Sequence, residues 1–259
     1  KLDNIMRTTF AKIDLDNLYH NFCQIKTIIG NRKIIGVVKA NAYGHSLTEI
    51  GKALEEFGID YLAVAFVTEG IALRNSGVKI PILVLVPEND NTIEACVDYD
   101  LDYTFETIDV AKKISSYALS CGKRAKLHLY VDTGMGRDGV PPEYVSKLIK
   151  ECSNLPNIDI VGLMSHFATS ESDVSYARLQ LKRFNDVVDT LKTDGYEFET
   201  IHIANSGALF SLPESWFNAV RPGLALYGYV PNGNIAIQKD FRPVMEIYSK
   251  VISKRTVSK

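Results

Sequence analysis

Residues 34–46 read IIGVVKANAYGHS, so that a lysine, Lys39, directly follows a run of five apolar residues. The run IIGVV is apolar on both faces, which is typical of a strand covered by helices rather than a half-solvated one. A lone lysine at the end of such a strand usually extends to solvent. A desolvated lysine near other cations instead has a lowered pKa and can form an imine with a carbonyl compound.

Similar runs follow along the chain and alternate with helical patterns. Together with the first, they cover residues 34–40, 61–65, 80–86, 101–105, 125–132, 158–167, 200–205 and 218–223. Helices are predicted over 46–57, 89–99, 107–121, 141–152 and 174–193, and the short connection over 206–217 has the least helical pattern. Eight strands with intervening helices predict an α/β fold, a closed (β/α)8 barrel of the TIM type over residues 33–230.

The two ends of the sequence are expected to lie outside the barrel strands. Residues 1–32 contain an additional strand and then a helix over 17–29, with Asp16 as its N-cap. Residues 231–259 begin as a loop-like linker and continue with the alternating pattern VMEIYSKVISKRTV, which predicts the first strands of an incomplete C-terminal β-domain. The sequence also lacks an initiator methionine, so we expect a piece of a longer protein.

Composition excludes several classes of protein. The formal net charge is −2, from 29 basic and 31 acidic residues, and no basic run stands out, so nucleic acid is not an expected partner. No apolar run approaches the ~20 residues that cross a bilayer, and the N-terminus is not a signal peptide. The four cysteines form no CxxC pair, which predicts reduced thiols in a cytoplasmic protein. No metal-ligand motif and no GxSxG elbow occur.

Polar or glycine-rich clusters follow five of the eight predicted strands. They begin at Lys39, at Asp132 (DTGMGRDG), at Ser165 (SHF), at Asn205 (NSG) and at Arg221 (RPG). The carboxyl ends of barrel strands meet at one rim, so these clusters predict a site there in which Arg137 and Arg221 supply the cations near Lys39. Taken singly, Arg221 also fits an ion pair, His166 a hydrogen-bonded core histidine, and the glycines a loop.

Together these segments resemble the alanine racemase family of pyridoxal phosphate (PLP) enzymes. The segments that carry the resemblance are AKIDLDNLYHN, VVKANAYGHS, YLAVA, VDTGMGRDG, GLMSHFATS, HIANSGAL and VRPGLALYG, in the order and at the spacing of the family. The resemblance implies a PLP-binding barrel followed by a β-domain, in a homodimer whose active sites are shared between subunits. It also implies racemisation of a small amino acid, with alanine for cell-wall precursors as the first candidate.

The resemblance also implies roles for individual residues. Lys39 would hold PLP and act as the base on one face of the substrate, and Arg221 would face the pyridine nitrogen. His166 would support that arginine and the ring, and Arg137 would reach the phenolic oxygen. The cofactor-binding set is completed by Asn205 and by the phosphate ligands Tyr43, Ser206 and the backbone amides of Gly223 and Leu224.

Two departures from the family pattern matter. Many members have a lysine, often carbamylated, where this sequence has Tyr130, so Arg137 must be braced differently. The second base of the family is a tyrosine from the partner's β-domain, and the sequence stops before it. The fragment is therefore expected to bind PLP while lacking half of the catalytic pair.

Three alternatives stay open. One is a serine racemase of the same family, in some cases the cytoplasmic part of a membrane-anchored protein of vancomycin-resistance type. A second, which is not an enzyme, is the one-domain PLP-binding protein of cofactor homeostasis on the same barrel; ANAYGHS, VRPGLALYG and the β-like tail argue against it. The third is a PLP decarboxylase on this barrel, which would usually place a glutamate where Arg221 lies.

Overall fold

The computed structural model describes residues 9–88, 90–231, 233 and 235–257. Eight parallel strands form one sheet in the order β8-β7-β6-β5-β4-β3-β2-β9. A hydrogen bond of 2.8 Å from the backbone N–H of Arg221 to the carbonyl of Ala204 joins the ends of β8 and β9 and closes the barrel. The strands are β2 (Lys33–Val37), β3 (Tyr61–Val64), β4 (Ile82–Val84), β5 (Asp102–Phe105), β6 (Ala125–Tyr130), β7 (Ile158–Met164), β8 (Thr200–His202) and β9 (Ala219–Val220). The predicted (β/α)8 barrel is confirmed.

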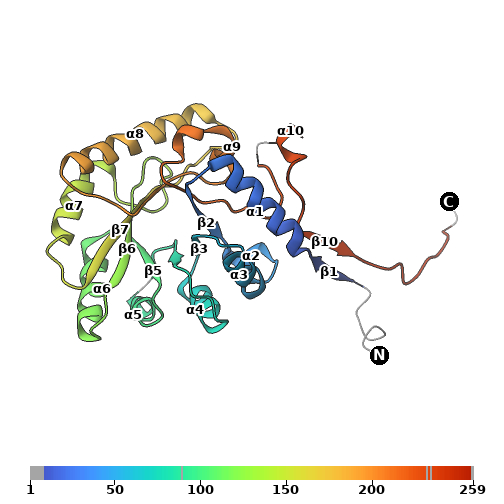
Figure 1. The fold of residues 1–259 in the computed structure, drawn as a ribbon, viewed down its shortest axis with the longest axis horizontal. Coiled ribbons are helices and arrows are strands. Elements are labelled where there is room, and N and C mark those ends of the chain that lie inside the picture. Colours follow the sequence, from blue (N-terminus) through green and yellow to red (C-terminus); the bar gives the residue numbers. More distant parts are fainter. Residues whose placement is uncertain (1–8, 89, 232, 234, 258–259) are drawn as a thin grey trace.

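Helices surround the barrel on its outer side (Figure 1). They are α3 (Leu47–Glu56), α4 (Val67–Asn75), α5 (Asp90–Asp98), α6 (Ile108–Ser120), α7 (Val145–Cys152), α8 (Val174–Thr193) and the short α9 (Ser206–Ser211). Only α4 was not predicted. Its buried face contains Gly70, where a Cβ would lie 2.8 Å from the side chain of Leu101, so a glycine interrupts the apolar stripe that marks the other helices.

The predicted strands extend too far at their carboxyl ends. Strand β2 stops at Val37 rather than near Lys39, and β6 stops at Tyr130 rather than at Asp132. The runs over 158–167 and 200–205 likewise overreach the ends of β7 and β8. Just beyond these ends the backbone still bonds to a neighbouring strand, as the N–H of Val38 does to the carbonyl of Ala63 and the N–H of Val131 to that of Met164, both at 2.8 Å, and the regular ladder then stops. The residues released in this way line the site described below.

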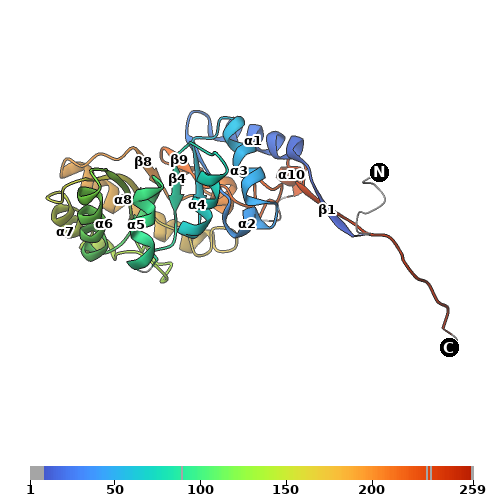
Figure 2. The same ribbon diagram turned by 90° about the horizontal axis from the view of Figure 1, so that it is seen from below.

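The ends of the described chain pair with each other. Strand β1 (Phe10–Ile13) runs antiparallel to β10 (Met245–Tyr248), and the rings of Phe10 and Tyr248 stack with centroids 5.3 Å apart. This small sheet and the residues after it extend to one side of the barrel (Figure 2). Both strands were expected from the sequence, but not their pairing, because an alternating pattern does not name its partner.

Helix α1 (Leu15–Ile29) anchors the segment that precedes β10. Its N-cap is Asp14, which accepts a hydrogen bond of 3.0 Å from the N–H of Asn17, so the predicted cap at Asp16 is wrong. The buried amide of Asn21 donates to the carbonyl of Arg242 at 2.8 Å and accepts from its N–H at 2.8 Å. The segment interpreted as a linker, which includes α10 (Ile235–Gln238), is therefore held against the barrel.

Two findings bear on the class of protein. None of the helices in the described part of the chain has the length and apolarity that a membrane span requires. All four cysteines, at positions 23, 96, 121 and 152, are free thiols.

Candidate functional site

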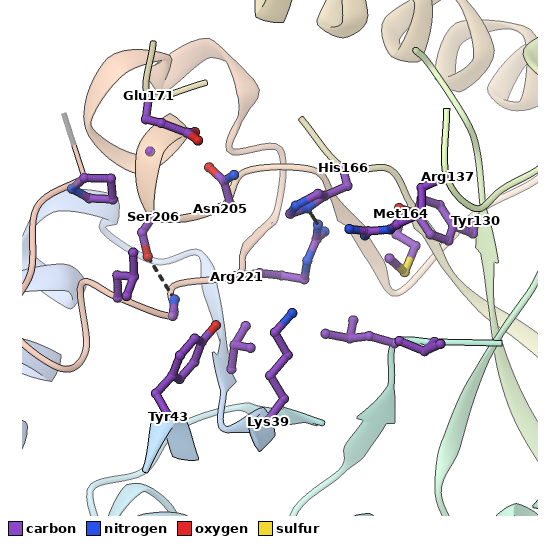
Figure 3. A pocket seen from close by; sticks show the side chains of 17 residues that line it. Lys39, Tyr43, Tyr130, Arg137, Met164, His166, Glu171, Asn205, Ser206 and Arg221 are labelled. Atoms are coloured by element: carbon purple, nitrogen blue, oxygen red, sulfur yellow. Dashed lines mark hydrogen bonds between the residues drawn. The ribbon is translucent and has the colours of Figure 1, made fainter. Parts of the chain in front are cut away.

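The nine predicted site residues all line one cavity of about 250 Å³ at the carboxyl ends of the strands. Figure 3 labels the side chains of seven of them, which converge from the loops after β2, β6, β7, β8 and β9. The nine are Lys39, Tyr43, Arg137, His166, Asn205, Ser206, Arg221, Gly223 and Leu224. The structure also brings Tyr130, Met164, Glu171 and Gly207 to the same walls. Of these, the sequence analysis had named Tyr130 as a departure and Gly207 within the cluster that begins at Asn205.

Lys39 enters the cavity from a left-handed turn. The segment α2 (Lys39–Tyr43) has four consecutive residues with φ between 52° and 55°, from Ala40 to Tyr43, and none of them is glycine. Left-handed backbone costs such residues roughly 1–2 kcal/mol each. The turn is held by Glu69, which accepts from the N–H of Ala40 at 2.6 Å, and by Asn41, which accepts from the N–H of Leu47 at 2.9 Å.

The amine of Lys39 is partly buried among cations. Burial lowers the pKa of Lys39, and the positive charges of Arg137 and Arg221 lower it further, whereas Glu69 opposes them. A larger fraction of this amine is therefore neutral, and nucleophilic, than of a solvated lysine at the same pH.

Arg221 is fixed in place by hydrogen bonds on both terminal nitrogens of its guanidinium. Nη1 donates to Nδ1 of His202 at 2.8 Å and to the carbonyl of His202 at 2.9 Å. Nη2 donates to the carbonyl of Ser165 at 2.8 Å and to Nδ1 of His166 at 3.2 Å. An arginine has five N–H donors, and only the Nε–H of Arg221 has no hydrogen bond to any residue that the structure describes. One donor of a buried cation is thus left for a ligand.

His166 is neutral in this setting. Burial lowers the pKa of His166 to about 3, and the charges of Arg221, Arg137 and Lys39 act in the same direction. Since Nδ1 accepts from Arg221, the ring proton is assigned to Nε2. His166 therefore acts as a hydrogen-bond partner of Arg221 rather than as a cation.

The opposite wall of the cavity presents a tight backbone turn. The hydroxyl oxygen of Ser206 accepts from the N–H of Gly223 at 2.9 Å and from the N–H of Ala225 at 3.2 Å. A Cβ at position 223 would lie 2.7 Å from the hydroxyl of Tyr43, so a glycine is required for this close approach. Hydroxyls beside a tight backbone turn are the kind of surface that binds a phosphate group, which would take the N–H of Gly223 over from Ser206.

The DTGMGRDG loop carries Arg137. Its ends are joined by a hydrogen bond of 2.9 Å from the N–H of Val140 to the carbonyl of Tyr130. Asp132 accepts from the N–H groups of Gly134 and Gly136, at 2.9 and 3.1 Å. Arg137 forms an ion pair with Asp138, with Nε and Oδ2 3.0 Å apart. The buried hydroxyl of Tyr130 forms no complete hydrogen bond within the described part of the chain, but it faces Arg137, whose charge lowers the pKa of the phenol against the larger effect of burial.

Sequence reasoning missed the residues that hold these side chains. His202 lies in the segment HIANSGAL and is the last residue of β8, but the predicted strand continued to residue 205 and so placed it in mid-strand. Glu69 gave no signal, because a glutamate in the first turn of a helix is ordinary.

The amino-acid sequence matches a known protein family. Residues 13–231 match the family model for the N-terminal domain of alanine racemase. The chain is 42% identical over 250 residues to the alanine racemase of Clostridium novyi, which covers 95% of this chain and 65% of that protein. It is 41% identical over 258 residues to the alanine racemase of Clostridium tetani, covering 98% of this chain and 66% of that protein.

Solved structures agree with the sequence matches. The alanine racemase of Clostridium difficile 630 in complex with cycloserine superposes with a TM-score of 0.90 at 36% identity, covering 93% of this chain and 68% of that one. The Bacillus anthracis alanine racemase with bound L-Ala-P gives a TM-score of 0.84 at 31% identity, covering 93% and 64%. The chain thus spans about two thirds of the length of its relatives.

Proposed function

The chain belongs to the alanine racemase family, whose N-terminal domain it matches from residue 13 to 231, and from this premise we propose that it is the PLP-binding barrel of an amino-acid racemase acting on alanine. The observation that carries the proposal is the position of Lys39, whose amine lies in one cavity with Arg137 and Arg221 and has a pKa lowered by burial and by both cations. The names of the relatives support alanine as the substrate.

The residues of the cavity fit PLP group by group. Lys39 would hold the cofactor covalently through its carbonyl carbon. The turn at Gly223 and Leu224, with Ser206 and Tyr43, would hold the phosphate, and the free Nε–H of Arg221 would serve the ring nitrogen. The buried hydroxyl of Tyr130, which forms no complete hydrogen bond among the described residues, is a further polar atom for the cofactor or substrate.

When bound, PLP supplies an electron sink that makes the Cα–H of an attached amino acid acidic. Lys39 would then take or return a proton at Cα from one face of the substrate. Arg221 is held by four hydrogen bonds and stays cationic, so it offers the ring nitrogen a hydrogen bond without giving up its proton. An unprotonated ring nitrogen weakens the electron sink, which favours return of the proton over decarboxylation or transamination.

Inversion at Cα needs a proton carrier on each face, and this chain offers Lys39 for one. We propose that the second carrier belongs to the region of the family's proteins that lies beyond this sequence, and that the whole protein is a homodimer sharing its sites. Loss of a positioned proton carrier typically costs a factor of about 10²–10⁴ in rate.

The test is hydrogen exchange in deuterated solvent with the chain saturated with PLP. The α-hydrogen of D-alanine should exchange faster than that of L-alanine, while racemisation stays slow. Serine, the alternative substrate, is measured beside alanine, and a preference for serine would replace alanine in the proposal. Fast racemisation by this chain alone would mean that a residue within it serves as the second base, and equal exchange of both enantiomers would argue against the role of Lys39.

A further inference from the structure

A row of buried polar side chains leads from Arg221 into the interior of the barrel. Arg221 contacts His202 at the end of β8, and Nε2 of His202 lies 3.0 Å from Nδ1 of His128 on β6. Nε2 of His128 lies 3.5 Å from Oδ2 of Asp102, the first residue of β5, and Asp102 accepts a hydrogen bond of 2.6 Å from the hydroxyl of Tyr61. All five side chains are at most 5% exposed. The row therefore connects the site with the opposite end of the barrel.

The protons in this row follow from what each group can donate. An arginine has no acceptor, so Nδ1 of His202 must carry a lone pair and its proton must be on Nε2. That proton points to Nδ1 of His128, which must in turn accept, so the proton of His128 is also on Nε2. Both rings are then neutral, and the row ends in a carboxylate. The 3.5 Å between His128 and Asp102 is longer than a normal hydrogen bond, but no other partner is offered to this Nε2 within the described residues.

The burial of His202 also favours its neutral form. The pKa of His202 lies well below its ordinary value, first because of burial and then because of Arg221 and His128. A protonated His202 would place an N–H against the donors of Arg221. The hydrogen-bond geometry and the burial therefore both exclude a positively charged His202.

We propose that Asp102 is a positioning residue for Arg221, acting through the tautomers of His128 and His202. The carboxylate is the acceptor that keeps the proton of His128 on Nε2. Without it, the proton of His128 can move to Nδ1, where it opposes the Nε2–H of His202 and drives that proton to Nδ1, against Arg221. The guanidinium would then lose its hydrogen bond to the ring of His202 and gain freedom at the rim of the cavity. The consequence for catalysis rests on the proposed function, but the tautomers do not.

The test is ¹⁵N NMR of the histidine rings in the whole chain without PLP, between pH 6 and 8. A nitrogen that carries a proton and one that carries a lone pair give separate signals, so each tautomer can be assigned. His128 and His202 should both be neutral with the proton on Nε2. A proton on Nδ1 of His202, or a protonated His128, would overturn the proposal even if no variant folds.

Two variants test the role of the carboxylate. Asp102→Leu removes the acceptor and should shift His128 and His202 towards mixed tautomers, with loss of the slow-rotating guanidinium signals of Arg221. Tyr61→Phe removes a neighbour of the same carboxylate but leaves the acceptor in place, so its histidine signals should stay as in the wild type. Unchanged tautomers in Asp102→Leu would overturn the proposal. Because PLP is absent, a failure here leaves the assignment of Lys39 untouched, and a failure of Lys39 to bind PLP leaves this result untouched.

Discussion

Oε1 of Glu69 accepts a hydrogen bond of 2.6 Å from the backbone N–H of Ala40, the residue directly after Lys39. Oε2 of the same carboxylate accepts from the N–H groups of Ala65 and Phe66, at 2.8 and 3.2 Å. One side chain thus joins the start of α4 to the end of β3 and to the left-handed turn. Because that turn contains no glycine, its conformation depends on contacts of this kind.

Replacing Glu69 tests this dependence. Glu69→Gln keeps the length of the side chain but has one acceptor oxygen for three N–H groups, so it should lower the free energy of unfolding by about 1–3 kcal/mol. Loss of its negative charge should also lower the pKa of Lys39 further. Urea denaturation measures the first effect, with Glu49→Gln, an exposed glutamate on α3, as the control that should change it by less than about 0.5 kcal/mol. Equal effects of the two variants would show that the hydrogen bonds of Glu69 do not stabilise the left-handed turn.

A methyl group at position 223 should disturb Tyr43. The new Cβ of Gly223→Ala would lie 2.7 Å from the tyrosine hydroxyl, an overpacking that typically costs about 1–3 kcal/mol. Tyr43→Phe removes that oxygen, so Gly223→Ala should cost less in its background. A double-mutant cycle in urea measures the coupling. Strict additivity would mean that the two residues do not restrict each other.

Removing the hydroxyl of Tyr130 should weaken ligand binding without destabilising the fold. This oxygen is buried and forms no complete hydrogen bond among the described residues, so Tyr130→Phe should leave the free energy of unfolding unchanged or raise it by about 1 kcal/mol. Affinity for PLP or substrate should fall. The control is Tyr103→Phe: its equally buried hydroxyl accepts from the N–H of Glu88 at 2.6 Å, so its loss should destabilise the fold. A destabilised Tyr130→Phe with unchanged binding would make Tyr130 a structural residue.

The pH dependence of Lys39 has a definite sign. Its pKa in the folded protein lies below the ordinary value of 10.5, so the rate of its reductive alkylation should reach half-maximum at a lower pH than that of a lysine model peptide. Between the pKa of Lys39 in the folded protein and its ordinary value, the unfolded chain binds more protons than the folded chain. In this pH range Lys39 therefore makes the free energy of unfolding rise with pH. Arg137→Met removes a nearby cation and should move the midpoint upwards, whereas Arg178→Met on the outer helix α8 should not. A midpoint at or above that of the peptide would contradict the assigned environment.

The barrel and the residues that line its site could be predicted from the sequence because both depend on where the strands end. Apolar runs separated by helical patterns indicate the strands, and the polar residues after them must meet at one rim. Lys39 and Arg221 lie far apart in the sequence, yet their positions after strands were enough to bring them together.

The backbone conformations and buried contacts that position the site residues could not be predicted from the sequence. Residues 40–43 read ANAY, and nothing in their intrinsic preferences indicates four left-handed residues, because the cost is met by the distant Glu69. His128 and Asp102 read as ordinary positions within strands, since no pattern shows that a polar side chain inside a barrel meets another. The cap at Asp14 rather than Asp16 was a choice between two aspartates that fit equally well.

Covalent attachment of PLP to Lys39 can be observed by a labelling experiment. The purified chain is incubated with PLP, treated with borohydride and digested, and the modified peptide is identified by mass spectrometry. The unreduced mixture should be yellow, and after reduction the cofactor should be attached to Lys39, with the label lost in Lys39→Ala. A label on another lysine, or no covalent attachment at all, would show that Lys39 does not hold the cofactor.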